Sequence, residues 1–484
     1  MAARNVEIKE KKVIDFTSGN VAKHILNFYW PLIMTSMLQQ IYNFVDAKIV
    51  GKGLGDNAFA AVGNMGSLFF LIVGFSFGLA NGFGVLLAQS FGAKKEEELR
   101  HRLAGTIQLS IFLIILLTTF SILFLPTALG LIKTDEALMA DCLKYGYIIF
   151  GGLAASISYN VSAAVLRSLG DSRTPLKAII LSSIVNLSLD SFFIFVMHTG
   201  VEGAAVATIV SQVISAFVCI RRLSRIEVIK LSREDFKNEK KIYLDLVKNG
   251  LPMAFMNSIT AIGCMVVQSF INRCGVDYTT AYTACSKYLN LFMNPASTAG
   301  NAMSAYTSQN YGARKFDRIW SGFKVCITIA IIAYIILGSV LVFAPYTLAS
   351  FLIEGDAAVQ LACGYFPLVG RTIIIVDCLF VVRCGAQGMG DPVIPMWSGV
   401  LEMVLRTGVI SYFITKVGFN AAAYAEITAW TGALLMNIYA FGRKLLPGLK
   451  AQVKTHLGEE KGYGNNKFGY FSQKGEGNVQ GHRC

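Results

Sequence analysis

Four polar residues in the first half of the chain have the types and the expected depths of a site for a small cation. Asn186 and Asp190 are four residues apart in an apolar segment, so they share one face of the expected helix. Asp46 lies late in the first apolar segment and Thr208 early in the sixth, at a similar depth. A charge at membrane depth costs at least about 2.5 to 3.5 kcal/mol and usually faces a cavity or a partner. Two carboxylates, an amide and a hydroxyl predict a site for a proton or Na⁺.

Two other interpretations of these residues stay open. The four side chains could form an ordinary buried hydrogen-bond network, and Asp46 could simply end its helix at the membrane interface. The same helix also carries Pro31, which removes one backbone hydrogen bond and crowds the preceding turn. We therefore expect a hinge and a titratable group in one helix.

The second half of the chain has no matching acid pair. The positions equivalent to Asp46 and Asp190 fall near Gln268 and Ile410, which are not acids. Asp377 lies near the middle of an apolar segment instead. It is a second-rank candidate for binding a cation.

A further group of charges follows Asp377. Glu402 precedes Arg406 by four residues, the favourable order for an ion pair on one helix. This pair fits a structural role as well as a substrate contact. Glu426 is expected at the membrane interface, near the outer start of the last apolar segment.

Motifs of soluble enzymes are absent from the sequence. It contains no zinc-protease histidine pair, P-loop or nucleophile elbow, and it has five histidines in all. The ten cysteines are scattered without CxxC spacing, so they indicate packing residues rather than a metal site. We expect no enzyme activity, no cofactor and no metal other than Na⁺ at the cation site.

The composition is that of a polytopic membrane protein. Of 484 residues, 54% are hydrophobic and 15% are charged, and the mean hydropathy is +0.53. An apolar run of about 20 helical residues crosses about 30 Å of hydrocarbon. Twelve such runs are predicted, at about 25–46, 58–88, 103–125, 137–165, 175–197, 203–220, 245–271, 279–309, 323–345, 358–382, 393–415 and 421–442.

The net charge of +13 does not indicate nucleic-acid binding, because the basic residues gather in alternate connections. The two termini and the even-numbered connections hold 33 Lys and Arg, and the odd-numbered connections hold 6. Positive residues stay on the cytoplasmic side, so both termini are predicted inside the cell, in the cytoplasmic (inner) membrane of the cell.

The two halves of the chain are an internal duplication with an offset near 220 residues. The repeated segments are Gln89–Lys95 with Gln309–Lys315, Pro31 with Pro252, Gly170–Pro175 with Gly390–Pro395, and Gly200–Ala207 with Gly418–Ala425. Because the offset holds six helices, both halves have the same orientation, and a substrate site is expected between or within them. The predicted parts are a cytoplasmic tail (1–24), an N-lobe (25–220), a basic linker (221–241), a C-lobe (242–445) and a polar, disordered tail (446–484).

Several of these segments resemble the multidrug and toxic compound extrusion (MATE) transporters, over about residues 15–445. The segments that carry the resemblance are Pro31–Gly51, Ala88–Ala93, Leu166–Asp171 with Pro175, and Asn186–Asp190. The resemblance implies an all-α membrane protein with twelve transmembrane helices in two pseudo-symmetric six-helix bundles, arranged as a V. Asp46, Asn186, Asp190 and Thr208 match the cation site of the DinF-like branch, which Tyr145 and Asn160 complete. Pro31 and Gln39 match its first-helix bend and cavity positions.

The resemblance also implies a function. We expect an antiporter that exports organic, cationic or amphipathic small molecules in exchange for H⁺ or Na⁺, acting as a monomer in the lipid bilayer. NorM-like members use an acid in helix 7 together with one in helix 10, and here helix 7 has none, so Asp377 alone makes a weak C-lobe cation site. The alternatives are a lipid-linked oligosaccharide flippase of the same superfamily and a membrane scaffold that transports nothing.

Overall fold

The computed structural model describes residues 14–131, 134–237 and 239–472, with the backbone alone at residues 47, 56, 57, 67 and 455–472. All regular elements in this part of the chain are helices. The first half holds α1 (Val21–Leu54), α2 (Asp56–Gly92), α3 (Glu96–Leu131), α4 (Glu136–Gly151), α5 (Leu153–Ser168), α6 (Arg173–Ser191) with its π-helical end η1 (Phe192–Val196), and α7 (Gly200–Leu223). The connection contains η2 (Glu227–Ile229) and η3 (Glu234–Phe236).

The second half repeats this order. It holds α8 (Lys240–Asn272), α9 (Val276–Gly312), α10 (Phe316–Ala333) continued by η4 (Tyr334–Gly338) and α11 (Ser339–Phe343), the short α12 (Pro345–Leu352), α13 (Asp356–Gly388), α14 (Val393–Val417) and α15 (Asn420–Ser472). When α4 with α5, and α10 with η4 and α11, are each taken as one unit, the described residues form two bundles of six long helices. This confirms the predicted architecture.

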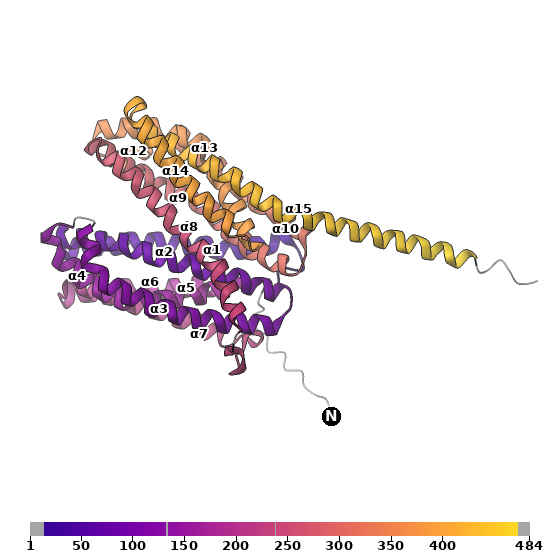
Figure 1. The fold of residues 1–484 in the computed structure, drawn as a ribbon. Coiled ribbons are helices and arrows are strands. Elements are labelled where there is room, and N and C mark those ends of the chain that lie inside the picture. The colour runs from indigo at the N-terminus through magenta and orange to yellow at the C-terminus, as the bar shows by residue number, and fades with distance from the viewer. Residues whose placement is uncertain (1–13, 132–133, 238, 473–484) are drawn as a thin grey trace, which may run out of the picture.

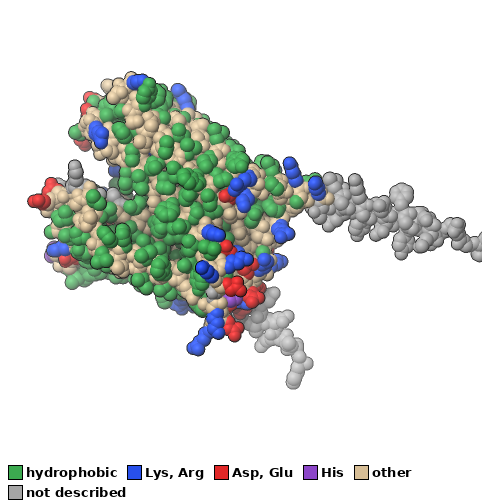
Figure 2. All heavy atoms as spheres, in the orientation of Figure 1, with side chains coloured by type: hydrophobic (Ala, Val, Ile, Leu, Met, Phe, Trp, Pro, Cys, Tyr) green, Lys and Arg blue, Asp and Glu red, His purple; other side chains and the backbone are tan. Residues whose placement is uncertain are grey.

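The two bundles form a V. They diverge at the end that carries α4 and α12, which we call the open end, and meet at the end near the N-terminus, which we call the closed end (Figure 1). On the face shown in Figure 2, hydrophobic side chains cover much of the surface between the two ends, and more charged side chains gather toward the closed end than elsewhere. Among the described residues, eight helices are long and apolar enough to cross a membrane, or nine if α4 and α5, which meet at a 46° bend, form one span.

α1 and α8 each begin against the opposite bundle. The first turns of α1, including Phe28 and Ile33, share a core with Met303 and other residues of the second half, while the rest of α1 packs on α6. In α8, Leu246 and Ala254 belong to a core of the first half. The predicted linker at residues 221–241 therefore separates the two halves in the sequence, whereas in the structure α1 and α8 each contact both bundles.

The closed end is held by a symmetric crossing of α2 and α9. A Cβ atom added at Gly92 would lie 1.9 Å from the carbonyl oxygen of Gln309, and one added at Gly312 would lie 2.0 Å from that of Gln89. The side chain of Gln89 donates to the carbonyl of Gly388 at 3.0 Å, and that of Gln309 donates to the carbonyl of Ser168 at 2.8 Å. The repeated motifs of the sequence therefore form the contact between the bundles.

Gly78 and Gly82 of α2 continue this contact along the V. The Cβ position of Gly78 meets the backbone of Ala254, and that of Gly82 meets the backbone of Gly250 in α8. Gly74, four positions before Gly78 in the same helix, has open space beside it. Of these three glycines, Gly78 and Gly82 therefore pack against α8 and Gly74 does not.

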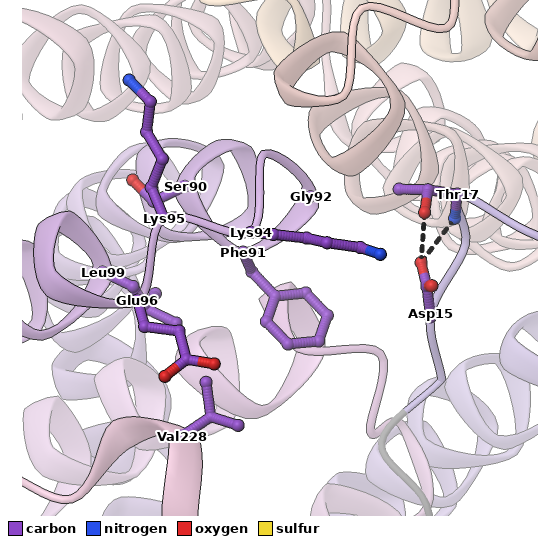
Figure 3. Close-up of a pocket in the computed structure, with 10 residues that line it drawn as sticks. All are labelled: Asp15, Thr17, Ser90, Phe91, Gly92, Lys94, Lys95, Glu96, Leu99 and Val228. Atoms are coloured by element: carbon purple, nitrogen blue, oxygen red, sulfur yellow. Dashed lines mark hydrogen bonds between the residues drawn. The ribbon is translucent and has the colours of Figure 1, made fainter.

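Residues 14–20, the N-terminal strap, cross the closed end. Phe16 is fully buried between the bundles, and Arg318 of α10 donates to the carbonyls of Phe16, Ser18 and Gly19. Asp15 accepts hydrogen bonds from the backbone and hydroxyl of Thr17. A cavity of about 190 Å³ lies between this strap and the α2–α3 turn, with the side chain of Lys94 extending toward Asp15 and Thr17 (Figure 3).

The structure differs from the sequence prediction at the C-terminal tail. Residues 446–472 continue α15 as a helix instead of being disordered, and residues 473–484 lie outside the described part. Gln452 makes reciprocal hydrogen bonds with Asp317 at the start of α10. This contact holds the turns that follow Pro447 against α10, although the proline removes one helical hydrogen bond.

Candidate functional site

The carboxyl groups of Asp46 and Asp190 lie beside each other where α1 packs against α6. Asn186 and Asp190 are both fully buried, on the shared face that their spacing predicts. Asp46 is half-buried. All three lie in the half of the N-lobe nearer the open end, because α1 and α6 both run toward that end.

Polar atoms in this cluster lack partners. Within the described residues, Asp46 Oδ1, both carboxyl oxygens of Asp190, and Oδ1 and Nδ2 of Asn186 are buried without a hydrogen bond. A buried polar group left unpaired costs about 1–3 kcal/mol. Adjacent carboxylates also repel each other unless a proton or cation lies between them. The oxygen-rich set can therefore hold a proton or a Na⁺ ion.

Hydroxyl groups from three helices surround the two acids. Thr208 of α7 is half-buried and Tyr145 of α4 is buried. The hydroxyl of Tyr145 lies near Thr208 and within electrostatic range of both carboxyl groups. Tyr42, one helical turn before Asp46 in α1, has the same neighbours. Tyr42 is not among the residues predicted from the sequence, although its spacing of four from Asp46 places both on one face.

The helix that carries Asp190 changes geometry directly after it. Residues Phe192–Val196 form a π-helical turn, in which the amide of Met197 donates to the carbonyl of Phe192. Such turns often occur at functional sites, since they turn neighbouring side chains relative to a regular helix. The C-lobe helix α14 has no π-helical turn at the equivalent place.

The remaining predicted N-lobe residues lie elsewhere. Asn160 is half-buried in α5, 15 positions after Tyr145 and beyond the bend between α4 and α5. At 1.5 Å per residue it is about 20 Å from Tyr145 along the span, too far to join the acids. Gln39 is exposed on α1.

Pro31 lies inside α1 where that helix passes from one bundle to the other. The hydroxyl of Thr35 donates back to the carbonyl of Pro31 at 2.7 Å, a bond that often bends a helix. The hydroxyl of Ser36 donates to Oδ1 of Asn294 in α9 at 2.7 Å. The segment around the predicted hinge is thus anchored to the C-lobe, and the segment with Asp46 is anchored to α6.

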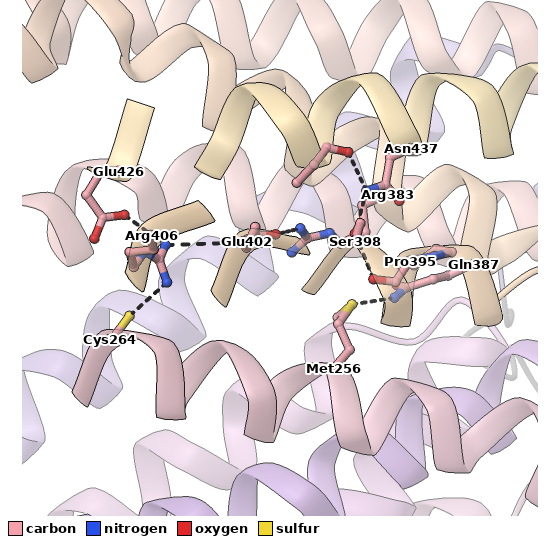
Figure 4. Close-up of polar contacts among 11 residues, drawn as sticks. Met256, Cys264, Arg383, Gln387, Pro395, Ser398, Glu402, Arg406, Glu426 and Asn437 are labelled. Atoms are coloured by element: carbon pink, nitrogen blue, oxygen red, sulfur yellow. Dashed lines mark hydrogen bonds and ion pairs between the residues drawn. The ribbon is translucent and has the colours of Figure 1, made fainter. Parts of the chain in front are cut away.

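The C-lobe contains a buried row of alternating charges (Figure 4). Arg383 of α13 forms a close ion pair with Glu402 of α14. Arg406, one turn further along α14, binds Glu426 of α15 at 2.8 Å and is 3.9 Å from Glu402. The predicted pair of Glu402 and Arg406 is therefore one link of a longer row, and each of the two has a closer partner on another helix.

Two sequence expectations about this row were wrong. Glu426 is 6% exposed and lies inside the bundle rather than at the interface, because Arg406 compensates its charge there. Arg383, which falls just outside the predicted run 358–382 and hence in a connection, lies inside α13 and is 6% exposed. Asp377 is 1% exposed, has one carboxyl oxygen without a partner among the described atoms, and is not paired to any arginine of the row.

A fold of two helical bundles around buried acids, with membrane-length apolar helices, is that of a membrane transporter. The MatE family model matches residues 31–192 and again 252–412, more than half of the chain and once per bundle. The protein belongs to this family, the MATE transporters.

The relatives agree with this assignment. "Probable multidrug resistance protein YoeA" of Bacillus subtilis is 29% identical over 66% of this chain and 70% of its own. The "FAD transporter" of Shewanella oneidensis is 22% identical over 75% of this chain and 82% of its own. The structure of a MATE transporter described as an outward-facing conformation superimposes with a TM-score of 0.84 at 21% identity, covering 91% of this chain and all of that one.

Proposed function

We propose that this protein is a cation-coupled antiporter that uses H⁺ or Na⁺ to export organic, cationic or amphipathic small molecules. The observation that carries this proposal is the group of partnerless polar atoms on Asp46, Asn186 and Asp190. A structural network would satisfy these atoms internally, whereas a binding site leaves them for the ion.

The coupling ion loads from the open end. Both acids lie in the half of the N-lobe that this end exposes to water, so an entering H⁺ or Na⁺ relieves the repulsion between the carboxylates. Binding then changes the interactions of Tyr42 and Asp46, and therefore the packing of the second part of α1 against α6.

A bend of α1 at Pro31 links this change in packing to a movement of the bundles. The first part of α1 is held by the C-lobe and the second part by α6, so a bend at Pro31 moves the two bundles relative to each other. The ion stabilises the bent conformer over the straight one, which is the differential binding that coupling requires. A bend toward the cavity leaves less room for the substrate and expels it.

The closed end is proposed to face the cytoplasm, with both termini inside the cell and the protein in the cytoplasmic membrane. The Lys and Arg bias of the connections supports this orientation. Single cysteines placed in the linker at residues 225 and 230 should resist a membrane-impermeant reagent in intact cells and react in inverted vesicles. The opposite labelling pattern would reverse the assigned topology.

The antiport mechanism is tested in proteoliposomes loaded with a fluorescent cationic dye. We expect efflux to collapse when one of the two gradients, H⁺ or Na⁺, is dissipated, and to survive removal of the other. Efflux that survives loss of both gradients contradicts coupling. We further propose that the protein acts in the membrane as a monomer without a cofactor, since each chain contains both bundles and the whole cation site.

A further inference from the structure

Arg167, near the end of α5, is unlike the other arginines inside the described part of the chain. The other buried or half-buried arginines each reach a carboxylate or a set of backbone carbonyls, as Arg102 does with Glu98 and Arg406 with Glu426. Arg167 is half-buried, and no carboxylate of the described residues lies within 4.0 Å of its guanidinium. An intramembrane charge without an acidic partner is a candidate for binding a substrate.

The guanidinium of Arg167 points into the bundle rather than toward the cytoplasmic surface. Its Nη2 donates a long hydrogen bond to Oδ1 of Asn81 at 3.4 Å, and its Cζ lies 5.8 Å from the ring centroid of Phe77. Both residues belong to α2. Asn81 is 11 positions before the end of α2 at Gly92, which is about 16 Å inside the closed end. Helical side chains lean toward the helix N-terminus, which for α5 is the open end.

Arg167 adjoins the contact between the bundles at the closed end. The carbonyl of Ser168, the next residue, accepts the hydrogen bond from Gln309 of the C-lobe. Gly78 and Gly82, next to Phe77 and Asn81 in α2, touch α8. Arg167 therefore lies next to the contact that closes the cytoplasmic end. A substrate that enters from the cytoplasm passes this contact when it opens.

The duplication shows that the fold does not need this charge. Gln387 occupies the equivalent position of the C-lobe, where it contacts Sδ of Met256 at 3.3 Å. The turns that follow the two residues have the same positive φ at Gly170 and Gly390. A neutral amide thus supports the same local structure, and at this position the positive charge is found in the N-lobe alone.

We propose that Arg167, Asn81 and Phe77 form a subsite for the anionic group, carboxylate or phosphate, of an aromatic substrate. Arginine binds either group through two parallel hydrogen bonds, the amide of Asn81 adds a donor, and the ring of Phe77 packs on a planar substrate. The transported compounds then include zwitterions and anions in addition to cations. This inference rests on the proposed export function, because it names a substrate class for the same cleft.

The test uses matched dyes and three purified full-length variants. Rhodamine B carries a carboxylate that its ethyl ester lacks, and flavin mononucleotide carries a phosphate that riboflavin lacks. Dissociation constants are measured by fluorescence for the wild type, Arg167→Gln and Arg167→Lys. The control is Arg173→Gln, which removes an exposed charge from the neighbouring turn.

We expect Arg167→Gln to weaken binding of the anionic dye of at least one pair by about tenfold or more, with less than about a twofold change for its neutral or esterified partner. Arg167→Lys should retain part of the difference, and Arg173→Gln should change neither dye. The pair that responds identifies the carboxylate or the phosphate as the preferred group.

Equal loss for both members of each pair, no loss for either, or no binding of the anionic dyes to the wild type would overturn the subsite. Its failure is separate from failure of the proposed function. Wild-type proteoliposomes that export the rhodamine ester, combined with unchanged dye ratios in Arg167→Gln, reject the subsite alone. Ratios that change in a protein that exports none of the dyes reject the export function and retain the subsite.

Discussion

At the residue scale, the two lobes differ in the partners of their buried carboxylates. The C-lobe row pairs each of its carboxylates with an arginine, whereas the N-lobe acids Asp46 and Asp190 have only each other and neutral side chains. A paired charge is a fixed part of the structure, but an unpaired acid changes state when a cation arrives. Under the proposed antiport function, this contrast favours coupling at the N-lobe acids and a structural role for the C-lobe row.

Neutralising the N-lobe acids should abolish transport and leave folding intact. Asp46→Asn and Asp190→Asn are each expected to reduce gradient-driven dye efflux to the level of empty proteoliposomes while expression stays near normal, because removing an intramembrane acid eases insertion. Asp277→Asn, at an exposed position near the open end, is the control and should keep wild-type efflux. Aggregated or poorly expressed protein in both site variants would favour a structural network instead.

Glu402→Gln should show the reverse pattern. It leaves Arg383 without its close partner and weakens the surroundings of Arg406, and breaking a buried pair on one side costs about 3–5 kcal/mol. We expect a clear drop in the melting temperature of the purified protein. The double variant Glu402→Leu with Arg383→Met should regain much of that loss. A normal melting temperature with an altered substrate range would instead place Glu402 in substrate binding.

At the element scale, glycines decide how closely the bundles meet. Gly92→Ala puts a methyl group 1.9 Å from the backbone oxygen of Gln309, so α2 and α9 have to separate. We expect a lower melting temperature and reduced transport. Gly74→Ala is the matched control in the same helix, where the added methyl meets open space and alanine favours the helix by about 0.5–1 kcal/mol. Equal effects of the two substitutions would contradict the crossing as the closing contact.

The sequence predicted the elements better than their contacts. Apolar periodicity and the 220-residue offset identify the helices and the two bundles, since both depend on local pattern. Neither pattern reveals that α1 and α8 each begin against the opposite bundle, because this arrangement depends on packing between distant segments. The position of Arg383 is hidden for a related reason: a charge near the end of a span reads as a loop residue, because its partner Glu402 lies on another helix. Asp190 and Asn186 were found because spacing alone puts them on one face.

At the scale of the whole molecule, the closed end is secured twice, by the α2–α9 crossing and by the N-terminal strap. Burial of the Asp15 carboxyl opposes its ionisation, but hydrogen bonds from Thr17 outweigh burial and hold its pKa below the ordinary value. Its contribution to the docked strap is therefore complete above the ordinary aspartate pKa and is lost as pH falls through the lowered, folded-state pKa. The strap should stay docked throughout the neutral range.

Opening of the closed end requires the strap to leave the C-lobe, so weakening the strap should favour the conformer that is open at this end. Arg318→Gln removes the guanidinium that holds three strap carbonyls, whereas Arg314→Gln, in the exposed turn before α10, leaves them in place. With spin labels at Lys95 and Lys324 in a cysteine-free background, Arg318→Gln should increase the population of long distances across the closed end. The control should keep the wild-type distribution. An unchanged distribution in Arg318→Gln would show that the α2–α9 crossing alone closes this end, with the strap a passive covering.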